Sequence, residues 1–178
     1  MSVLEVVEKF VSINGEGTKA GQLAVFIRFK GCNLNCKYCD TKWANEADAL
    51  AQKMAKEDIL EYVLSTGVKN VTLTGGEPLL RDGIEDVIEC LADNNLNVEI
   101  ETNGSIPLDN IRKLHKDNVT FTMDYKLSCS GMEQAMRLEN FSVLNKNDTV
   151  KFVAGCHEDL VRTKQIIEKY NLYGKCNL

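Results

Sequence analysis

Short runs of β-branched and aromatic residues alternate along the chain with longer amphipathic stretches. The runs predict strands over Val6–Ile13, Ala24–Lys30, Val71–Thr74, Asn97–Glu101, Thr120–Lys126 and Thr149–Val153. The amphipathic stretches predict helices over Lys56–Ser65, Gly83–Asp93, Leu108–Lys116, Met132–Glu139 and Asp159–Tyr170. This alternation of strand and helix is typical of parallel strands joined by right-handed crossovers.

Polar residues fall on one face of these strands. Glu99 and Glu101 point away from Val98 and Ile100, because side chains alternate with a period of two along a strand. The polar faces of the neighbouring strands carry Arg28, Lys30, Thr122, Asp124, Lys126 and Ser128. One strand of this kind is explained by a solvated face, but several together favour a curved sheet around a polar cavity.

We therefore expect an α/β fold, namely a partial (β/α) barrel of about six mostly parallel strands with helices outside. The 178 residues suit a single domain over 1–178. Residues 176–178 resemble the opening of a further strand. The last strand is then either very short, or a C-terminal segment is lacking.

Charge and hydropathy narrow the class of protein. The net charge of −5 argues against nucleic acid as the main partner, since phosphate binding needs clustered Lys and Arg. No run approaches the roughly 20 apolar residues that span a bilayer. The N-terminus has an early acidic residue, Glu5, and no basic start followed by an apolar run. We expect a cytoplasmic protein that binds neither membrane nor nucleic acid.

Three of the seven cysteines lie close together, in the spacing C-x3-C-x2-C at Cys32, Cys36 and Cys39. In a reducing compartment such a group indicates metal ligands rather than disulfides. Three thiolates suit a [4Fe–4S] cluster with one iron left open for another ligand. Structural zinc normally takes four protein ligands, and no second C-x2-C follows. The scattered cysteines, which we expect to be ordinary core or surface residues, are Cys90, Cys129, Cys156 and Cys176.

Further motifs stand at predicted strand ends. Thr74-Gly75-Gly76-Glu77-Pro78 combines glycines, which permit close backbone approach, with a carboxylate that can bind an ammonium group. Glu101-Thr102-Asn103-Gly104 places a carboxylate, a natural acceptor for ribose hydroxyls, before a strong turn dipeptide. The loop Asn14-Gly15-Glu16-Gly17 presents a carboxylate to a heterocycle edge, and Arg28 can hold a substrate carboxylate. Each motif taken alone is also explained as a turn or a surface charge.

Together with Tyr38 just before the last cysteine, these motifs resemble the radical S-adenosylmethionine superfamily. Within it, the chain resembles the 7-carboxy-7-deazaguanine synthases of queuosine and deazapurine biosynthesis. The matching pieces are Ser12-Ile13-Asn14-Gly15-Glu16-Gly17, Phe26-Ile27-Arg28, Gly31-Cys32-Asn33-Leu34, Cys39-Asp40-Thr41, Thr74-Gly75-Gly76-Glu77-Pro78 and Glu101-Thr102-Asn103-Gly104. One difference is Asn14, which stands where many relatives have glutamine.

The resemblance implies a lyase that converts 6-carboxy-5,6,7,8-tetrahydropterin to 7-carboxy-7-deazaguanine plus ammonia, through a 5′-deoxyadenosyl radical that takes hydrogen from C6. It implies a [4Fe–4S] cluster on Cys32, Cys36 and Cys39, and Mg²⁺ at Thr41. It assigns S-adenosyl-L-methionine to Tyr38, Cys39, Gly76, Glu77, Glu101, Asn103, Lys126 and Ser128. It assigns the pterin to Ile13, Asn14, Gly15, Glu16, Arg28 and Thr74. It also implies a homodimer and an external electron donor such as flavodoxin or ferredoxin.

Two alternatives stay open at this point. A radical enzyme of this length is also compatible with an activase that makes a glycyl radical on a protein partner, and such an activase would lack a pocket near Glu16 and Arg28. A non-catalytic zinc or electron-transfer protein is the other alternative. An electron carrier is expected to hold all iron sites with protein ligands, which this spacing does not offer.

Overall fold

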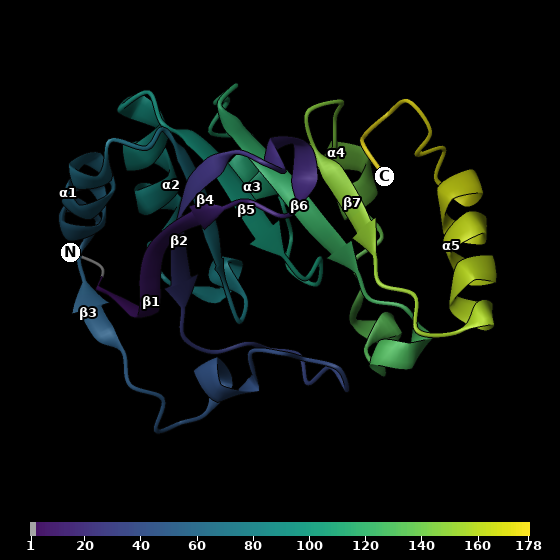
Figure 1. Cartoon of the computed structure of the whole chain (residues 1–178). Coiled ribbons are helices and arrows are strands. Elements are labelled where there is room, and N and C mark those ends of the chain that lie inside the picture. The colour runs from purple at the N-terminus through teal and green to yellow at the C-terminus, as the bar shows by residue number, and fades with distance from the viewer. Residues whose placement is uncertain (1–2) are drawn as a thin grey trace.

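The computed structural model describes residues 3–178, whose strands form one curved sheet (Figure 1). The strands are β1 (Leu4–Ile13), β2 (Leu23–Phe29), β3 (Gln52–Met54), β4 (Asn70–Gly75), β5 (Asn97–Thr102), β6 (Val119–Tyr125) and β7 (Thr149–Phe152). The helices are α1 (Lys56–Thr66), α2 (Ile84–Asp93), α3 (Asp109–Arg112), α4 (Asn140–Val143) and α5 (His157–Lys169). The prediction of an α/β fold with mostly parallel strands is confirmed; among the described residues the sheet is open and has seven strands, where about six were expected.

The strands lie in the order β3-β1-β2-β4-β5-β6-β7. From β2 to β7 the neighbours in this order are all parallel, so their carboxyl ends meet at one edge, toward the bottom of Figure 1. Strand β1 pairs antiparallel with both β2 and β3. Residues 14–22, which join β1 to β2, are too few for a crossover and form a turn in which Asn14 bonds to Gln22 and Gly21.

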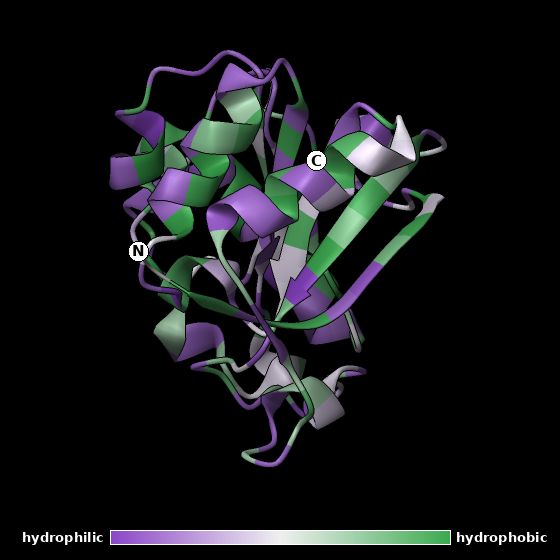
Figure 2. Ribbon diagram, turned by 90° about the vertical axis from the view of Figure 1, so that its left-hand side faces the viewer, coloured by the Kyte–Doolittle hydropathy of each residue, from purple (hydrophilic) through white to green (hydrophobic). Residues whose placement is uncertain are grey.

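The apolar core lies between the sheet and the helices. Ile27, Leu73 and Ile100 of three neighbouring strands are fully buried in it. Helix α2 contributes a stripe of buried residues three and four positions apart, including Val87 and Leu91. The helices accordingly alternate between hydrophilic and hydrophobic bands in Figure 2. Burial of each such side chain stabilises the fold by about 1.5–3 kcal/mol, which fixes the sheet that carries the polar face.

The three long helices α1, α2 and α5 confirm the predicted helices to within two residues at each end. The predicted helix over Met132–Glu139 is wrong. That segment holds only a 3-10 turn over Glu133–Ala135, and α4 begins later, at Asn140. Its backbone is engaged elsewhere, since the Arg137 N–H donates to the Gly104 carbonyl 3.1 Å away. Long-range packing therefore replaces the local helical bonds.

Other elements also differ from the predicted ranges. The predicted helix over Leu108–Lys116 is only one turn long, since α3 ends at Arg112 and His115 has a positive φ of 52°. Strand β3 was not predicted, because its three residues carry no readable alternation. At the other end of the chain, Asn177 forms a parallel bridge to Thr149 of β7. Across residues 3–178, no helix is long and apolar enough to cross a membrane.

Candidate active site

A cavity of about 670 Å³ opens at the carboxyl ends of the parallel strands. Parallel α/β sheets normally bind their ligands at this edge. The β1–β2 turn contributes to one part of the wall, and the loop over residues 31–41, here called the cysteine loop, contributes to another. The predicted site residues on the wall are Asn14, Gly15, Glu16, Arg28, Cys32, Cys36, Tyr38, Cys39, Thr41, Thr74, Gly76, Glu101, Asn103 and Lys126.

The cysteine loop is held in place by backbone hydrogen bonds. The Lys37 N–H donates to the Ser130 carbonyl at 3.0 Å, which ties the loop to the turn after β6. Within the loop, the Cys39 N–H donates to the Cys36 carbonyl at 3.2 Å. These bonds fix a backbone that would otherwise be free, and they keep all three cysteines on the cavity wall.

The cysteine sulfurs suit an iron–sulfur cluster better than a single ion. Among the described residues, the sulfurs of Cys32, Cys36 and Cys39 do not all lie within 4.8 Å of one another. A tetrahedral zinc ion, with bonds of about 2.3 Å, needs its sulfurs closer together than that. N–H donors also reach Cys32 Sγ from Leu34, at 3.4 Å, and from the Asn103 amide, at 3.5 Å. Such donors stabilise and tune a cluster held by thiolates.

Two glycines allow β4 to end directly against the cysteine loop. The Gly76 N–H donates to the Phe29 carbonyl and the Glu77 N–H to the Gly31 carbonyl, at 3.2 and 3.0 Å. A Cβ on Gly75, whose φ is 136°, would overlap the Phe29 backbone. A Cβ on Gly76 would overlap the Gly31 carbonyl and the side-chain oxygen of Asn45. The motif therefore requires glycine for packing as well as for any ligand.

Asn45 is a candidate ligand residue that the sequence did not reveal. It lies on the cavity wall, and its buried Oδ1 has no hydrogen-bond partner in the described part of the chain. A buried acceptor of this kind needs a donor, and a bound ammonium group in the cavity would supply one. The residue comes from a 3-10 turn over Lys42–Asn45, where no motif marks it.

Glu77 is fully buried and is not among the residues of the cavity wall. Its carboxylate accepts hydrogen bonds from the Thr102 hydroxyl at 2.9 Å, the Asn103 N–H at 2.7 Å and the Leu79 N–H at 3.0 Å. Burial raises the pKa of Glu77 to about 7, although these donors oppose the shift. In this structure Glu77 joins the ends of β4 and β5, and Asn103 in turn reaches Cys32.

Glu101 lies on the cavity wall at the end of β5. The Thr74 hydroxyl donates to it at 2.6 Å. Burial raises the pKa of Glu101 to about 7, and the nearby carboxylates of Glu16 and Glu99 act in the same direction. With this pKa the carboxyl group is partly protonated at neutral pH, and its oxygens can exchange hydrogen bonds with hydroxyl groups inside the cavity.

A chain of charges lines the opposite part of the cavity. Lys151 Nζ contacts Glu16 Oε2 at 2.5 Å and Asp124 Oδ1 at 3.1 Å, and Lys126 Nζ contacts Asp124 Oδ2 at 2.6 Å. Burial lowers the pKa of Lys151, but the two carboxylates outweigh burial and raise it. The predictions did not include Lys151 or Asp124 as site residues. Both belong to the polar faces of their strands, and this alternation was the available signal.

The Asn14 side chain connects the β1–β2 turn to the sheet beneath it. Its side chain is buried, and its amide donates to Glu99 and, at 3.4 Å, to the Thr72 hydroxyl. Its Oδ1 accepts from the Glu16 N–H at 2.9 Å. The Thr122 hydroxyl donates to the other oxygen of Glu99 at 2.6 Å. Glu99 and Asn14 together thus fix the position of the Glu16 loop.

The remaining predicted residues are placed as follows. Arg28 faces the cavity and pairs with Glu8 at 2.9 Å. The Thr41 hydroxyl lies 3.7 Å from Cys39 Sγ. Ile13 and Ser128 lie off the cavity wall: the Ile13 side chain is exposed, and the Ser128 hydroxyl donates to Asp159 at 2.7 Å.

An open sheet of mostly parallel strands, with three cysteines on a loop at its carboxyl edge, defines the radical S-adenosylmethionine class of enzymes. The chain matches the family model of the Radical SAM superfamily over residues 26–125. The crystal structure of QueE from Escherichia coli is similar with a TM-score of 0.71 and 24% identity, over 93% of this chain and 78% of that chain. SuiB from Streptococcus suis bound to precursor peptide SuiA has a TM-score of 0.59 and 14% identity, over 79% of this chain and 35% of that chain. These structures support the fold alone.

Curated relatives narrow the class to one family. A 7-carboxy-7-deazaguanine synthase of Clostridium acetobutylicum is 58% identical over 175 residues, covering 98% of this chain and 79% of the relative. That of Methanospirillum hungatei is 34% identical, covering 93% and 68%. The chain belongs to the 7-carboxy-7-deazaguanine synthase family of the radical S-adenosylmethionine superfamily. Membership implies a [4Fe–4S] cluster and S-adenosylmethionine, and the three loop cysteines fit that requirement.

Proposed function

We propose that this protein converts 6-carboxy-5,6,7,8-tetrahydropterin to 7-carboxy-7-deazaguanine with loss of ammonia. The observation that carries the proposal is the single cavity in which the cysteine loop faces Glu16, Arg28 and Lys151. A carboxylate and two cations suit a ligand that has both a donor-rich heterocycle edge and a carboxylate of its own. The relatives described above are named for a product, 7-carboxy-7-deazaguanine, that is itself a heterocycle carrying a carboxylate.

We call the part of the cavity beside the cysteine loop the cofactor end, and there we assign Cys32, Cys36 and Cys39 as the ligands of the cluster. When bound there, the cluster and S-adenosylmethionine supply the radical that takes hydrogen from C6 of the substrate. Asn45 Oδ1 accepts from the methionyl ammonium group, and Glu101 accepts from the ribose hydroxyls. Tyr38, Gly76, Asn103 and Lys126 complete this end.

The substrate end is assigned to Gly15, Glu16, Arg28 and Thr74, with Asn14 as a support. The Glu16 carboxylate accepts from the pterin N–H edge while Lys151 keeps it oriented. Arg28 exchanges its exposed partner Glu8 for the substrate carboxylate. Mg²⁺ at Thr41, a homodimer, a flavodoxin or ferredoxin donor and a cytoplasmic location belong to the same proposal. Mg²⁺ with one hydroxyl, a substrate carboxylate and several waters is chemically reasonable.

The experiment is an anaerobic assay of reconstituted, reduced enzyme with the carboxytetrahydropterin, S-adenosylmethionine and Mg²⁺. We expect 7-carboxy-7-deazaguanine, identified by mass spectrometry, with S-adenosylmethionine regenerated after each turnover. Cleavage of S-adenosylmethionine to 5′-deoxyadenosine without any deazaguanine product would sink the proposal. An assay of Arg28→Gln should lose product formation while the iron and sulfide content stays unchanged.

A glycyl-radical activase is the second candidate from the sequence. It was expected to lack a pocket near Glu16 and Arg28, whereas both residues line the cavity. Tight binding of the pterin, measured by calorimetry under anaerobic conditions, separates the two functions, because an activase has no reason to bind it.

A further inference from the structure

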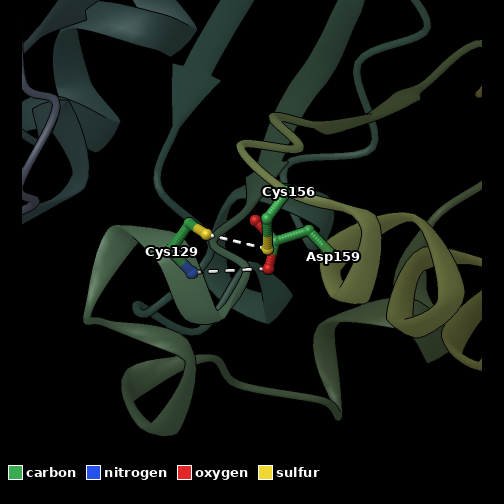
Figure 3. A group of neighbouring side chains, drawn as sticks. All are labelled: Cys129, Cys156 and Asp159. Atoms are coloured by element: carbon green, nitrogen blue, oxygen red, sulfur yellow. Dashed lines mark hydrogen bonds between the residues drawn. The ribbon is translucent and has the colours of Figure 1, made fainter.

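A pair of cysteines outside the cavity lies in direct contact. Cys129 Sγ donates a hydrogen bond to Cys156 Sγ at 3.0 Å, although the two residues are 27 positions apart in the chain (Figure 3). Cys129 lies in the turn over Ser128–Ser130 that follows β6, and Cys156 is the N-cap of α5. Both side chains are only partly buried, so small molecules have access to them. We call these two residues the thiol pair.

The carboxylate of Asp159 holds both segments of the thiol pair. Asp159 is fully buried and accepts from the Cys129 N–H at 3.3 Å and from the Gly155 N–H at 3.0 Å. It also accepts from the Ser128 hydroxyl at 2.7 Å. The Asp159 side chain therefore links Gly155, the residue before Cys156, to Cys129. Gly155 permits this approach, because a Cβ there would lie 3.1 Å from the Cys129 Cβ.

We propose that Cys129 and Cys156 form a reversible intramolecular disulfide, a redox site separate from the iron–sulfur cluster. The thiols are already held face to face by a buried carboxylate, so bond formation requires the sulfurs to approach by about 1 Å, to about 2.05 Å. The turn that carries Cys129 also supports the cysteine loop, through the bond from the Lys37 N–H to the Ser130 carbonyl. The thiol pair thus lies next to the hydrogen bond that holds the cysteine loop in place.

A metal ion is the competing occupant, since Cys129, Cys156 and Asp159 place three possible ligand atoms within 4.8 Å of one another. The Asp159 oxygens, however, already accept three hydrogen bonds, and a carboxylate has only about four lone-pair positions. An ion that took Asp159 as a ligand would compete with the bonds that bring the two segments together. Because the Asp159 carboxylate is already occupied by hydrogen bonds and the two sulfurs are in contact, a disulfide is favoured over a bound metal ion.

The order of the reaction follows from the hydrogen bonds. The bonds with Cys156 and Asp159 raise the pKa of the Cys129 thiol to about 12, so Cys129 keeps its proton at neutral pH. Cys156 therefore attacks a small-molecule disulfide such as oxidised glutathione, forming a mixed disulfide and releasing one thiol. Cys129 then loses its proton and attacks the Cys156 sulfur, which releases the second thiol. In sum, two protein thiols lose two electrons and two protons, and one disulfide becomes two thiols.

The test uses the cluster-loaded protein under anaerobic conditions. After incubation with oxidised glutathione and alkylation of free thiols, peptide mass spectrometry should find a cross-link between the Cys129 and Cys156 peptides. Dithiothreitol should remove the cross-link. Cys129→Ser should accumulate glutathione on Cys156, whereas Cys156→Ser should accumulate none on Cys129. Cys90→Ser, a change at a remote cysteine, should leave the cross-link unaltered.

Two results would overturn the proposal. One is the absence of the Cys129–Cys156 cross-link in the wild-type protein under conditions that glutathionylate another exposed cysteine. The other is retention of zinc, added as the chloride and measured by elemental analysis, that depends on Cys129 and prevents the cross-link. The wild-type measurements do not depend on the folding of any variant.

Discussion

The two ends of the cavity are built in different ways. At the end assigned to the cofactors, the backbone of the cysteine loop is held by the bonds from Glu77 to Gly31 and from Lys37 to Ser130. The fully buried Glu77 carboxylate also fixes Asn103, whose amide reaches Cys32. At the substrate end, the wall is made of ion pairs, with Lys151 between Glu16 and Asp124. The first end leaves little freedom for its backbone. The second end holds side chains whose partners a ligand can replace.

The difference matches what each ligand requires. An iron–sulfur cluster needs its cysteines fixed in advance, because a misplaced ligand loosens the metal site. A charged substrate instead gains by exchanging existing ion pairs for its own, since the groups are then never left buried without a partner. Changes at the cofactor end should therefore abolish cluster binding, and changes at the substrate end should weaken substrate binding alone.

The largest effect is expected for Gly76→Ala. The added methyl group would overlap the Gly31 carbonyl, which is backbone and has little room to move. We expect a destabilisation of about 3 kcal/mol and loss of most iron and sulfide after reconstitution. The matched control is Gly15→Ala, since beyond its two chain neighbours no described residue lies within 4 Å of a Cβ built there. Equal iron content in the two variants would show that the cofactor end is not tightly built.

The second prediction concerns pH. Burial raises the pKa of Glu77 and of Glu101 from 4.5 to about 7, so the folded chain binds more protons than the unfolded chain between these values. The free energy of unfolding should therefore fall as pH rises through this window, by up to about 3 kcal/mol per group. Denaturant unfolding at several pH values, without S-adenosylmethionine, measures this pH dependence of the free energy of unfolding. Glu77→Gln should flatten the dependence, and stability that instead rises between about pH 5 and 7 would contradict it.

The third prediction addresses Arg28 at the substrate end. Arg28→Lys keeps the charge but loses the two-pronged contact with a carboxylate, so kcat/KM should fall by about 10- to 100-fold. The cluster content should stay normal. Glu8→Gln removes the exposed partner of Arg28 and should change kcat/KM by less than about threefold. Loss of the cluster in Arg28→Lys would mean that the two ends are not independent.

The smallest effect is expected for Lys151→Gln, which leaves Glu16 and Asp124 without their shared cation. We expect KM for the pterin to rise by roughly tenfold, because Glu16 is no longer oriented and repels Asp124. Lys164→Gln breaks an exposed pair with Glu168 and should have no measurable effect. An unchanged KM in Lys151→Gln would remove Lys151 from the substrate end.

Strong local patterns made much of the molecule predictable. Helices α1, α2 and α5 follow clear amphipathic stretches, and the cysteine spacing marks its loop without any knowledge of the fold. The segment Met132–Glu139 could not be predicted in this way. Its sequence favours a helix, but its Arg137 N–H bonds to the distant Gly104 carbonyl and no such helix forms. Similarly, the β1–β2 pairing is antiparallel because the intervening turn is short, which the strand pattern did not show.

The sequence by itself therefore determined the class of the sheet, the loop that carries the three cysteines assigned to the cluster, and the polar faces that line the cavity. Only the tertiary structure decided that Glu77 is buried between strand ends and that Lys151 joins Glu16 to Asp124. It alone brought Cys129 to Cys156. The physical reason is distance along the chain. Periodicity and spacing report contacts between near neighbours, whereas these contacts join residues that only the packed sheet brings together.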